Sequence, residues 1–227
     1  MFEYLLPSLW MNSYPNTLLH ESSETAVRAQ QDFAKANSIP WGISEASCSE
    51  RKEDNHYRYH AFGLRSLALS RADGDDLVIS PYSSFLALLV DAPAAARNIC
   101  EMKRKGWTGT YGFYDACDFT ATRMTSGKSC EPVRCWMAHH QGMSLVAAAT
   151  VLSDMSMQRR FHAEPKVAAT ERLLQEKIPR TPVLELGLAR CEAEVSVIPA
   201  DDLDTATAAS CRLMDGMPRR IAGVQPR

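Results

Sequence analysis

The chain has 227 residues, 45% of them hydrophobic, and its 25 Lys and Arg against 27 Asp and Glu give a formal charge of -2. This content is enough for one sizeable core, or for part of a larger domain, and it excludes a disordered chain. The near-neutral charge disfavours nucleic acid and anionic membranes as partners and favours a neutral ligand.

The first predicted helix runs from about residue 17 to residue 37, with Leu19, Ala26 and Phe33 near one face and the charged residues elsewhere. Ser80 followed by Pro81 is typical of a helix start, and it predicts a short apolar helix that ends near residue 89. Asp91 can cap the next helix, from about 93 to 105, which ends before Gly106.

The last two predicted helices cover about residues 137–154 and 165–177. The first of them is almost entirely apolar from Leu145 to Leu152, which favours the interior wall of a barrel over an exposed face. The best strand pattern, Asp76 to Ser80, is isolated, so the sequence predicts an all-α fold. From residue 181 onward the periodicity fades, and residues 200–209 have the composition of a linker.

The cysteines predict a reducing, cytosolic environment. They are seven in number, at positions 48, 100, 117, 130, 135, 191 and 211, without a Cys-x-x-Cys pair. This pattern argues against a disulfide framework and against a zinc site. The longest apolar run, from Phe85 to Val90, is far shorter than the ~18 residues of a membrane span, so we expect no membrane contact from this segment.

Five loop segments combine aromatic rings with acids or imidazoles. They are FEYLLP (2–7), WGISE (41–45), HYRYHAFG (56–63), YGFYDA (111–116) and MAHHQGMS (137–144). Aromatic faces can cover the apolar side of a sugar ring, while carboxylates and imidazoles bind hydroxyls and move protons. For any one segment alone, packing is the commoner role. Together they indicate a carbohydrate site.

In their order and spacing these segments, with DLVISPY and MQRRFHAEP, resemble the glycoamylase-like transglycosylation domain of bacterial cyclic β-1,2-glucan synthases. The resemblance covers about residues 1–180 and implies the C-terminal portion of an (α/α)₆ barrel, with residues 181–227 as a tail toward a β-sandwich domain. It also implies retaining transglycosylation that closes a ring of β-1,2-glucan, without a metal or other cofactor. Full-length relatives are expected at the inner membrane.

The resemblance assigns Glu45 as the nucleophile, against the competing structural role of a glutamate that stabilises a helix N-terminus. A retaining mechanism needs a second carboxyl group about 5–5.5 Å away. In the family this acid/base precedes the FEYL motif, so no residue of this chain matches it. The sugar contacts that the resemblance implies are Glu3, Tyr4, Trp41, Arg58, Tyr114, Asp115, His139, His140 and Gln141.

Three alternatives stay open at this point. The chain can be a plain β-1,2-glucan hydrolase, or a non-catalytic remnant that exposes apolar surface around residues 145–152 because barrel helices are missing. The third is a metal hydrolase centred on His139, His140 and Asp115 or Asp118. We disfavour it, because adjacent side chains on a helix diverge by about 100° and are not expected to reach one ion.

Overall fold

The computed structural model describes residues 1–67, 76–124 and 127–177, so the predicted tail at 181–227, with its linker, lies outside the described residues. The described residues contain seven α-helices: α1 (Phe2–Leu5), α2 (Leu18–Asn37), α3 (Pro81–Leu86), α4 (Ala92–Arg104), α5 (Ala138–Leu152), α6 (Ser156–His162) and α7 (Pro165–Thr170). Short 3₁₀ helices cover Leu6–Leu9, Ala87–Leu89, Ala121–Arg123 and Glu171–Gln175.

Caps confirm the predicted starts of α2 and α4, whereas the helix predicted over 165–177 is α7 followed by a 3₁₀ helix, and α1 and α6 were not predicted. The side chain of Thr17 accepts from the backbone N–H of His20, and the chain leaves α2 through Ser38 in the left-handed conformation (φ 55°). The side chain of Asp91 accepts from the N–H of Ala94 and begins α4. These groups satisfy backbone donors that the first turn of a helix leaves without a partner.

The all-α prediction holds only in part, because the described residues are rich in helix but also form short strands. They are β1 (Ala46–Arg51), β2 (Tyr57–His60), β3 (Val78–Ile79), β4 (Thr108–Gly109), β5 (Gly112–Phe113), β6 (Ala116–Asp118) and β7 (Glu131–Val133). They pair in three antiparallel sheets, ordered β1-β2, β3-β6-β7 and β4-β5. Most are two or three residues long, too short to show the alternation that identifies a strand in a sequence.

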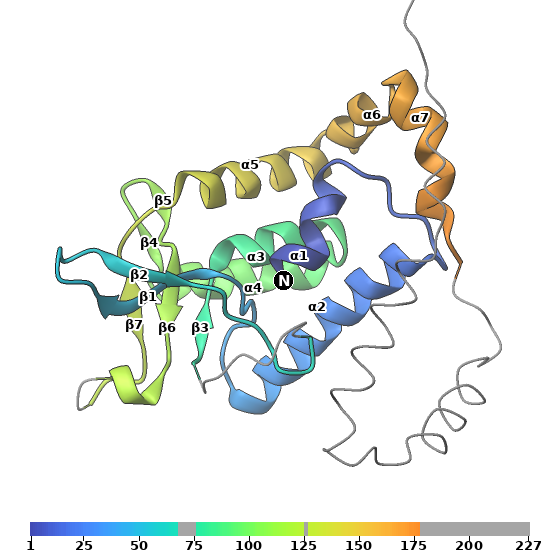
Figure 1. Cartoon of the computed structure of the whole chain (residues 1–227). Coiled ribbons are helices and arrows are strands. Elements are labelled where there is room, and N and C mark those ends of the chain that lie inside the picture. Colours follow the sequence, from blue (N-terminus) through green and yellow to red (C-terminus); the bar gives the residue numbers. More distant parts are fainter. Residues whose placement is uncertain (68–75, 125–126, 178–227) are drawn as a thin grey trace, which may run out of the picture. The chain divides into compact units, whose positions relative to one another are not determined.

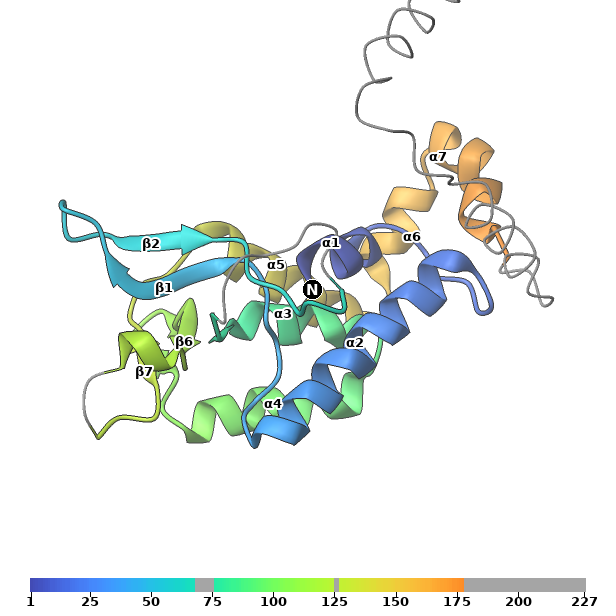
Figure 2. The same cartoon turned by 60° about the horizontal axis from the view of Figure 1, so that its bottom comes forward.

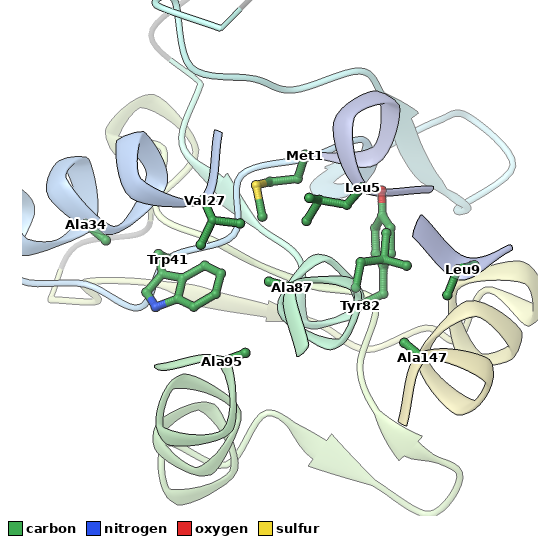
Figure 3. Packing of buried hydrophobic residues seen from close by; sticks show 11 residues of the cluster. Met1, Leu5, Leu9, Val27, Ala34, Trp41, Tyr82, Ala87, Ala95 and Ala147 are labelled. Carbon is green, nitrogen blue, oxygen red and sulfur yellow. The ribbon is translucent and has the colours of Figure 1, made fainter. Parts of the chain in front are cut away.

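The strands gather at one end of the described fold and α6 and α7 lie at the other, in both views (Figures 1 and 2). Between them α3 contacts α1, α4 and α5 and is buried along most of its length. The main apolar core joins Leu5, Val27, Tyr82 and Ala147, which come from α1, α2, α3 and α5. Trp41 packs into it beside Val27 and Ala95 (Figure 3).

Helix α5 buries a polar and small-residue face and exposes its leucines. His140, Ser144, Ala147 and Thr150 are buried, whereas Leu145 is 71% and Leu152 86% exposed. The expected apolar surface in this region is therefore present in the structure. No helix of the described residues is long and apolar enough to cross a membrane.

Candidate active site

The WGISE segment is held rigidly against α3 and α2. Gly42 adopts φ +131°, and a Cβ atom there would lie 2.5 Å from Oγ of Ser83, so the position requires glycine. The Gly42 carbonyl accepts from the hydroxyl of Ser83 (3.0 Å). The side-chain amide of Gln30 bonds both the N–H and the carbonyl of Ile43, each at 2.9 Å. These contacts fix the backbone that delivers Glu45 to the start of β1.

The half-buried carboxylate of Glu45 accepts a hydrogen bond of 2.8 Å from the Tyr59 hydroxyl. The pairing of β1 with β2 places Ala46 opposite His60 and Ser47 opposite Tyr59. Tyr59 therefore lies across the hairpin from the end of the WGISE segment. The register of two strands, and not proximity in sequence, brings the phenol to the carboxylate.

The hydroxyl of Tyr59 also reaches two imidazoles in the first turn of α5. Its oxygen lies 3.1 Å from Nε2 of His140 and 3.4 Å from Nε2 of His139. The expectation that these adjacent histidines diverge too far to reach one partner is wrong. Each ring extends beyond the helix surface, and rotation about the side-chain bonds brings both Nε2 atoms to one oxygen, with ring centroids 4.1 Å apart.

His140 is held from behind by a buried carboxylate. Its Nδ1 lies 2.6 Å from Oδ1 of Asp115, whose side chain is fully buried. The second oxygen of Asp115 accepts from the N–H of Ser47 at 2.7 Å. The His140 ring stacks on Tyr82, with ring centroids 3.7 Å apart and planes 13° from parallel. We call Glu45, Tyr59, His139, His140 and Asp115 the Glu45 network.

Burial determines the protonation of two members of the network. It raises the pKa of Tyr59 well above the usual value of about 10, and the carboxylate of Glu45 adds to the effect, so Tyr59 is a neutral phenol at physiological pH. Burial, together with the neighbouring His140, lowers the pKa of His139 below its usual value. His139 is therefore a neutral imidazole above pH 7.

A pocket of about 330 Å³ opens beside the Glu45 network and is walled by aromatic rings. Tyr111, at its rim, is 74% exposed and meets Trp136 edge-on, with centroids 5.2 Å apart. Tyr114 lies 5.3 Å from the same indole. Gly109 permits this packing, because a Cβ atom there would lie 2.7 Å from the Tyr114 ring and 2.8 Å from Trp136. Gln141 donates to the carbonyl of Phe113 (2.9 Å) and closes the wall.

The structure brings together only part of the predicted set of site residues. Glu45, Asp115, His139 and His140 are connected in the Glu45 network, and Tyr114 and Gln141 line the adjacent pocket. Glu3 is exposed on α1. The Tyr4 hydroxyl donates to the backbone carbonyl of Leu67 (3.0 Å), so it already has a protein partner.

Three residues predicted as sugar contacts are buried or have protein partners in the structure. Trp41 is only 8% exposed and belongs to the core, so it is not an open stacking surface. Arg58 alternates with Tyr59 along β2, so it faces away from Glu45 and pairs with Glu50 (3.2 Å). Both oxygens of Asp115 are engaged by His140 and Ser47, so its carboxylate already has protein partners although the residue lines the pocket.

Sequence analysis missed Tyr59, the residue at the centre of the network. The signal was present in the HYRYHAFG segment, where Tyr57 and Tyr59 alternate with Arg58 and His60. Interpreted as a strand of period two, this segment places the tyrosines on one face and the basic residues on the other. The sugar contact predicted from this segment, Arg58, lies on the basic face.

Glu45, His139 and His140 offer ligand atoms that all lie within 4.8 Å of one another, a spacing that can accommodate a metal ion. The hydroxyl of Tyr59 contacts all three of these atoms, at 2.8, 3.4 and 3.1 Å. A phenol has one proton, so it donates to only one of these atoms at a time. The function proposed below makes no use of a metal.

Comparison with known proteins identifies similar sequences and folds. A family model, Glycoamylase ("Putative glucoamylase"), matches residues 1–165. The chain is 41% identical over 180 residues to the cyclic beta-(1,2)-glucan synthase NdvB of Rhizobium meliloti (strain 1021), which is 79% of this chain and 6% of that protein. An endo-beta-1,2-glucanase from Chitinophaga pinensis, solved with sophorotriose and glucose, matches with a TM-score of 0.53 and 19% identity, over 76% of this chain and 40% of that one. A beta-1,2-glucanase from Parabacteroides distasonis matches with a TM-score of 0.50 and 16% identity, over 77% and 23% of the two chains.

At these identities the two glucanase structures show the fold alone. The chain spans 6% of the length of its curated relative and no more than 40% of either glucanase. The matched region therefore corresponds to part of a longer chain in each of these relatives.

Proposed function

The chain belongs to the glycoamylase family, and from this premise we propose that its Glu45 network and aromatic pocket process β-1,2-glucan. One observation carries the proposal: a half-buried glutamate, hydrogen-bonded to a phenol, belongs to a network whose His140 lines a pocket walled by tyrosine and phenylalanine. Aromatic walls favour the apolar faces of sugar rings, and an oriented carboxylate can attack an anomeric carbon. The similarity to a β-1,2-glucan synthase supports this class of substrate.

In the proposed reaction Glu45 is the nucleophile of a retaining transglycosylation. It forms a covalent bond to the anomeric carbon as the glycosidic bond breaks, and a hydroxyl of the glucan then displaces it to close a ring. Release by water would make the same site a hydrolase. No cofactor takes part in either case.

The acid/base carboxyl group is a separate element of the proposal. Asp115 does not qualify, because its side chain is fully buried and both of its oxygens are engaged. We place the acid/base in a part of the domain that precedes the FEYL motif in the relatives. From the resemblance to the family we also propose that the described helices are the C-terminal portion of an (α/α)₆ barrel. A cytosolic location for this segment, with full-length relatives at the inner membrane, is also proposed.

A glutamate substitution tests the nucleophile. The chain is joined to the upstream part of a related β-1,2-glucanase domain and assayed on linear β-1,2-glucan. We expect Glu45→Gln to lower turnover by about a thousandfold or more while glucan affinity changes only a few-fold, because the amide keeps the size of the side chain and loses the attacking charge. Glu50→Gln, on the opposite face of the hairpin, is the matched control and keeps full turnover.

The products separate the candidate reactions. Cyclic glucan indicates transglycosylation, whereas new reducing ends without rings indicate hydrolysis. Glucan binding without turnover in the joined protein would identify a sugar-binding module and would contradict the catalytic proposal. Near-normal turnover in Glu45→Gln would remove Glu45 as nucleophile.

A further inference from the structure

A cluster of three metal-ligand side chains lies on the β1-β2 hairpin, outside the Glu45 network. Sγ of Cys48, a carboxylate oxygen of Glu50 and a ring nitrogen of His60 all lie within 4.8 Å of one another. Two ligands of one tetrahedral zinc ion lie about 3.3–3.8 Å apart, because its bonds to sulfur, nitrogen and oxygen are about 2.0–2.3 Å long. Glu50 and His60 are exposed, so rotation of their side chains can supply the remaining closure of about 1 Å.

A β-bulge brings the cluster together. The register of the hairpin shifts between Ser47 and Arg51, so residues 48–50 of β1 stand opposite only residue 58 of β2. Ser49, in the middle of the bulge, is fixed to β6, because the Asp118 carboxylate accepts from its N–H at 2.9 Å and from its hydroxyl at 2.8 Å. Bulges re-aim side chains and are common beside functional sites. The ligand-bearing backbone is therefore held in place before any ion binds.

The sulfur of Cys48 is the innermost ligand atom of the cluster. Its residue is 0% exposed, and the backbone N–H of Glu50 donates to the sulfur. Burial by itself raises the pKa of this thiol. The charge of a bound metal ion outweighs that effect, because a coordinating thiol loses its proton to solvent as the metal binds.

The salt bridge from Arg58 to Glu50 competes only weakly with a metal ion. Nε of Arg58 lies 3.2 Å from Oε1 of Glu50, and the two side chains are 47% and 45% exposed. Ion pairs with this exposure contribute little, and a carboxylate has a second oxygen that can bind another cation. Glu50 can therefore serve both partners.

We propose that Cys48, Glu50 and His60 bind a zinc ion, with water as the fourth ligand. Thiolate and imidazole select zinc over magnesium and calcium, which prefer oxygen ligands, and three protein ligands leave one position of a tetrahedral ion open. The ion ties β1 to β2 in the hairpin that carries Tyr59. The pairing of two strands sets the spacing of the ligands, so the site needs no Cys-x-x-Cys pair in the sequence.

Cobalt, a spectroscopic substitute for zinc, tests the site in the full chain at pH 7 under reducing conditions. We expect Co²⁺ to produce the near-ultraviolet charge-transfer absorption of a thiolate-bound ion, to saturate at one equivalent and to be displaced by Zn²⁺. Cys48→Ser abolishes this absorption. Glu50→Gln and His60→Ala each weaken Co²⁺ affinity by about 100-fold or more, since losing a group that only hydrogen-bonds to a ligand already costs about 10–100-fold.

Three variants outside the cluster are the matched controls and keep the absorption and the affinity. Cys100→Ser removes an exposed free thiol on α4. His56→Ala removes an exposed imidazole of the same hairpin, which pairs with Asp54 at 3.1 Å. His139→Ala changes the cluster of Glu45, His139 and His140, which contains no sulfur and gives no thiolate absorption.

The absence of thiolate absorption in the unsubstituted chain overturns the proposal, and this measurement needs no variant. An absorption that survives Cys48→Ser also overturns it, because another thiol then binds the ion. Co²⁺ binding without this absorption, lost in His139→Ala, places the ion at the other cluster and overturns it too. Circular dichroism verifies the fold of each variant.

The zinc site is independent of the proposed function, since it is measured without glucan. Turnover is assayed with a chelator present, so Glu50→Gln remains the matched control for Glu45→Gln there.

Discussion

The role of an aromatic residue in this protein follows from its burial, and Trp41 and Tyr111 are opposite cases. Both stand beside a glycine in the loop segments, where Trp41 was predicted to contact a sugar and Tyr111 was not singled out. In the structure Trp41 is 8% and Tyr111 74% exposed. Trp41 fills the core between α2, α3 and α4, whereas Tyr111 stands at the rim of the pocket.

Alanine substitutions separate these two roles. Trp41→Ala is expected to lower the free energy of unfolding by about 3–5 kcal/mol, because it leaves a large cavity in the core. Tyr111→Ala is expected to change it by less than about 0.5 kcal/mol, as exposed sites usually do. Denaturant unfolding measures both effects.

For glucan affinity, measured by titration, we expect the reverse order: Tyr111→Ala has the larger effect and Trp41→Ala the smaller. Removing the Tyr111 ring should weaken affinity for linear β-1,2-glucan by about 1 kcal/mol, a several-fold effect, if the exposed ring stacks on sugar. Equal losses of stability in the two variants would contradict the assignment of Trp41 to the core.

At the scale of elements, the strands are tied together by one buried carboxylate. Asp118, at the end of β6, accepts from the N–H of Ser49 on β1 at 2.9 Å and from Nε of Arg123 at 2.7 Å. Burial alone would raise the pKa of Asp118, but the hydrogen bonds from Arg123, Ser49 and Thr120 outweigh it and leave the pKa below its usual value. The hairpin that carries Tyr59 is thereby anchored to the β3-β6-β7 sheet.

Acid should weaken this anchor. Since the folded pKa of Asp118 lies below the unfolded value of about 3.9, its contribution is fully present above that pH and is lost as the pH falls through the folded pKa. Asp118→Asn is expected to lower the free energy of unfolding by about 3 kcal/mol near pH 7, because it leaves Arg123 without its buried partner. The difference from the unsubstituted chain should narrow below about pH 4.

Unfolding by urea at several pH values measures this difference. Asp32→Asn, an exposed position on α2, is the control and should cost little at any pH. A difference for Asp118→Asn that stays constant from pH 7 down to pH 2 would contradict the depressed pKa.

At the scale of the whole molecule, the described fold presents an apolar helix face to solvent. Leu145 and Leu152 on α5 are among the most exposed large hydrophobic residues of the described ranges. Exposed apolar patches of this kind mark surfaces that other protein segments cover, or that associate.

A dye that fluoresces on apolar surfaces should bind the native chain at pH 7. We expect the double substitution Leu145→Lys and Leu152→Lys to reduce the signal and any concentration-dependent association, because it places charges on the exposed face of α5. Leu173→Lys, at a similarly exposed leucine away from α5 (78%), is the matched control and should change little. A reduction of the same size in the control would show that the α5 face is not the binding surface.

The sequence by itself determined the longer helices and the family. Caps such as Thr17 and Asp91 bond to backbone groups only a few residues away, so they can be recognised from the sequence alone. The ordered motifs carried the resemblance that the family model and the synthase relative confirm, and they singled out Glu45, His139 and His140. The role of Glu45 as nucleophile stays a prediction.

Only the tertiary structure decided the strands, the place of Tyr59 and the burial of Trp41 and Asp115. Strands of two or three residues have almost no pattern of their own, and their pairing partners lie up to tens of residues away. Which face of β2 meets Glu45 depends on the register of the hairpin, where a shift of one residue exchanges Tyr59 for Arg58. Burial is a property of the packed whole, so a tryptophan of the core and a tyrosine of the pocket rim are distinguished only after the chain has folded.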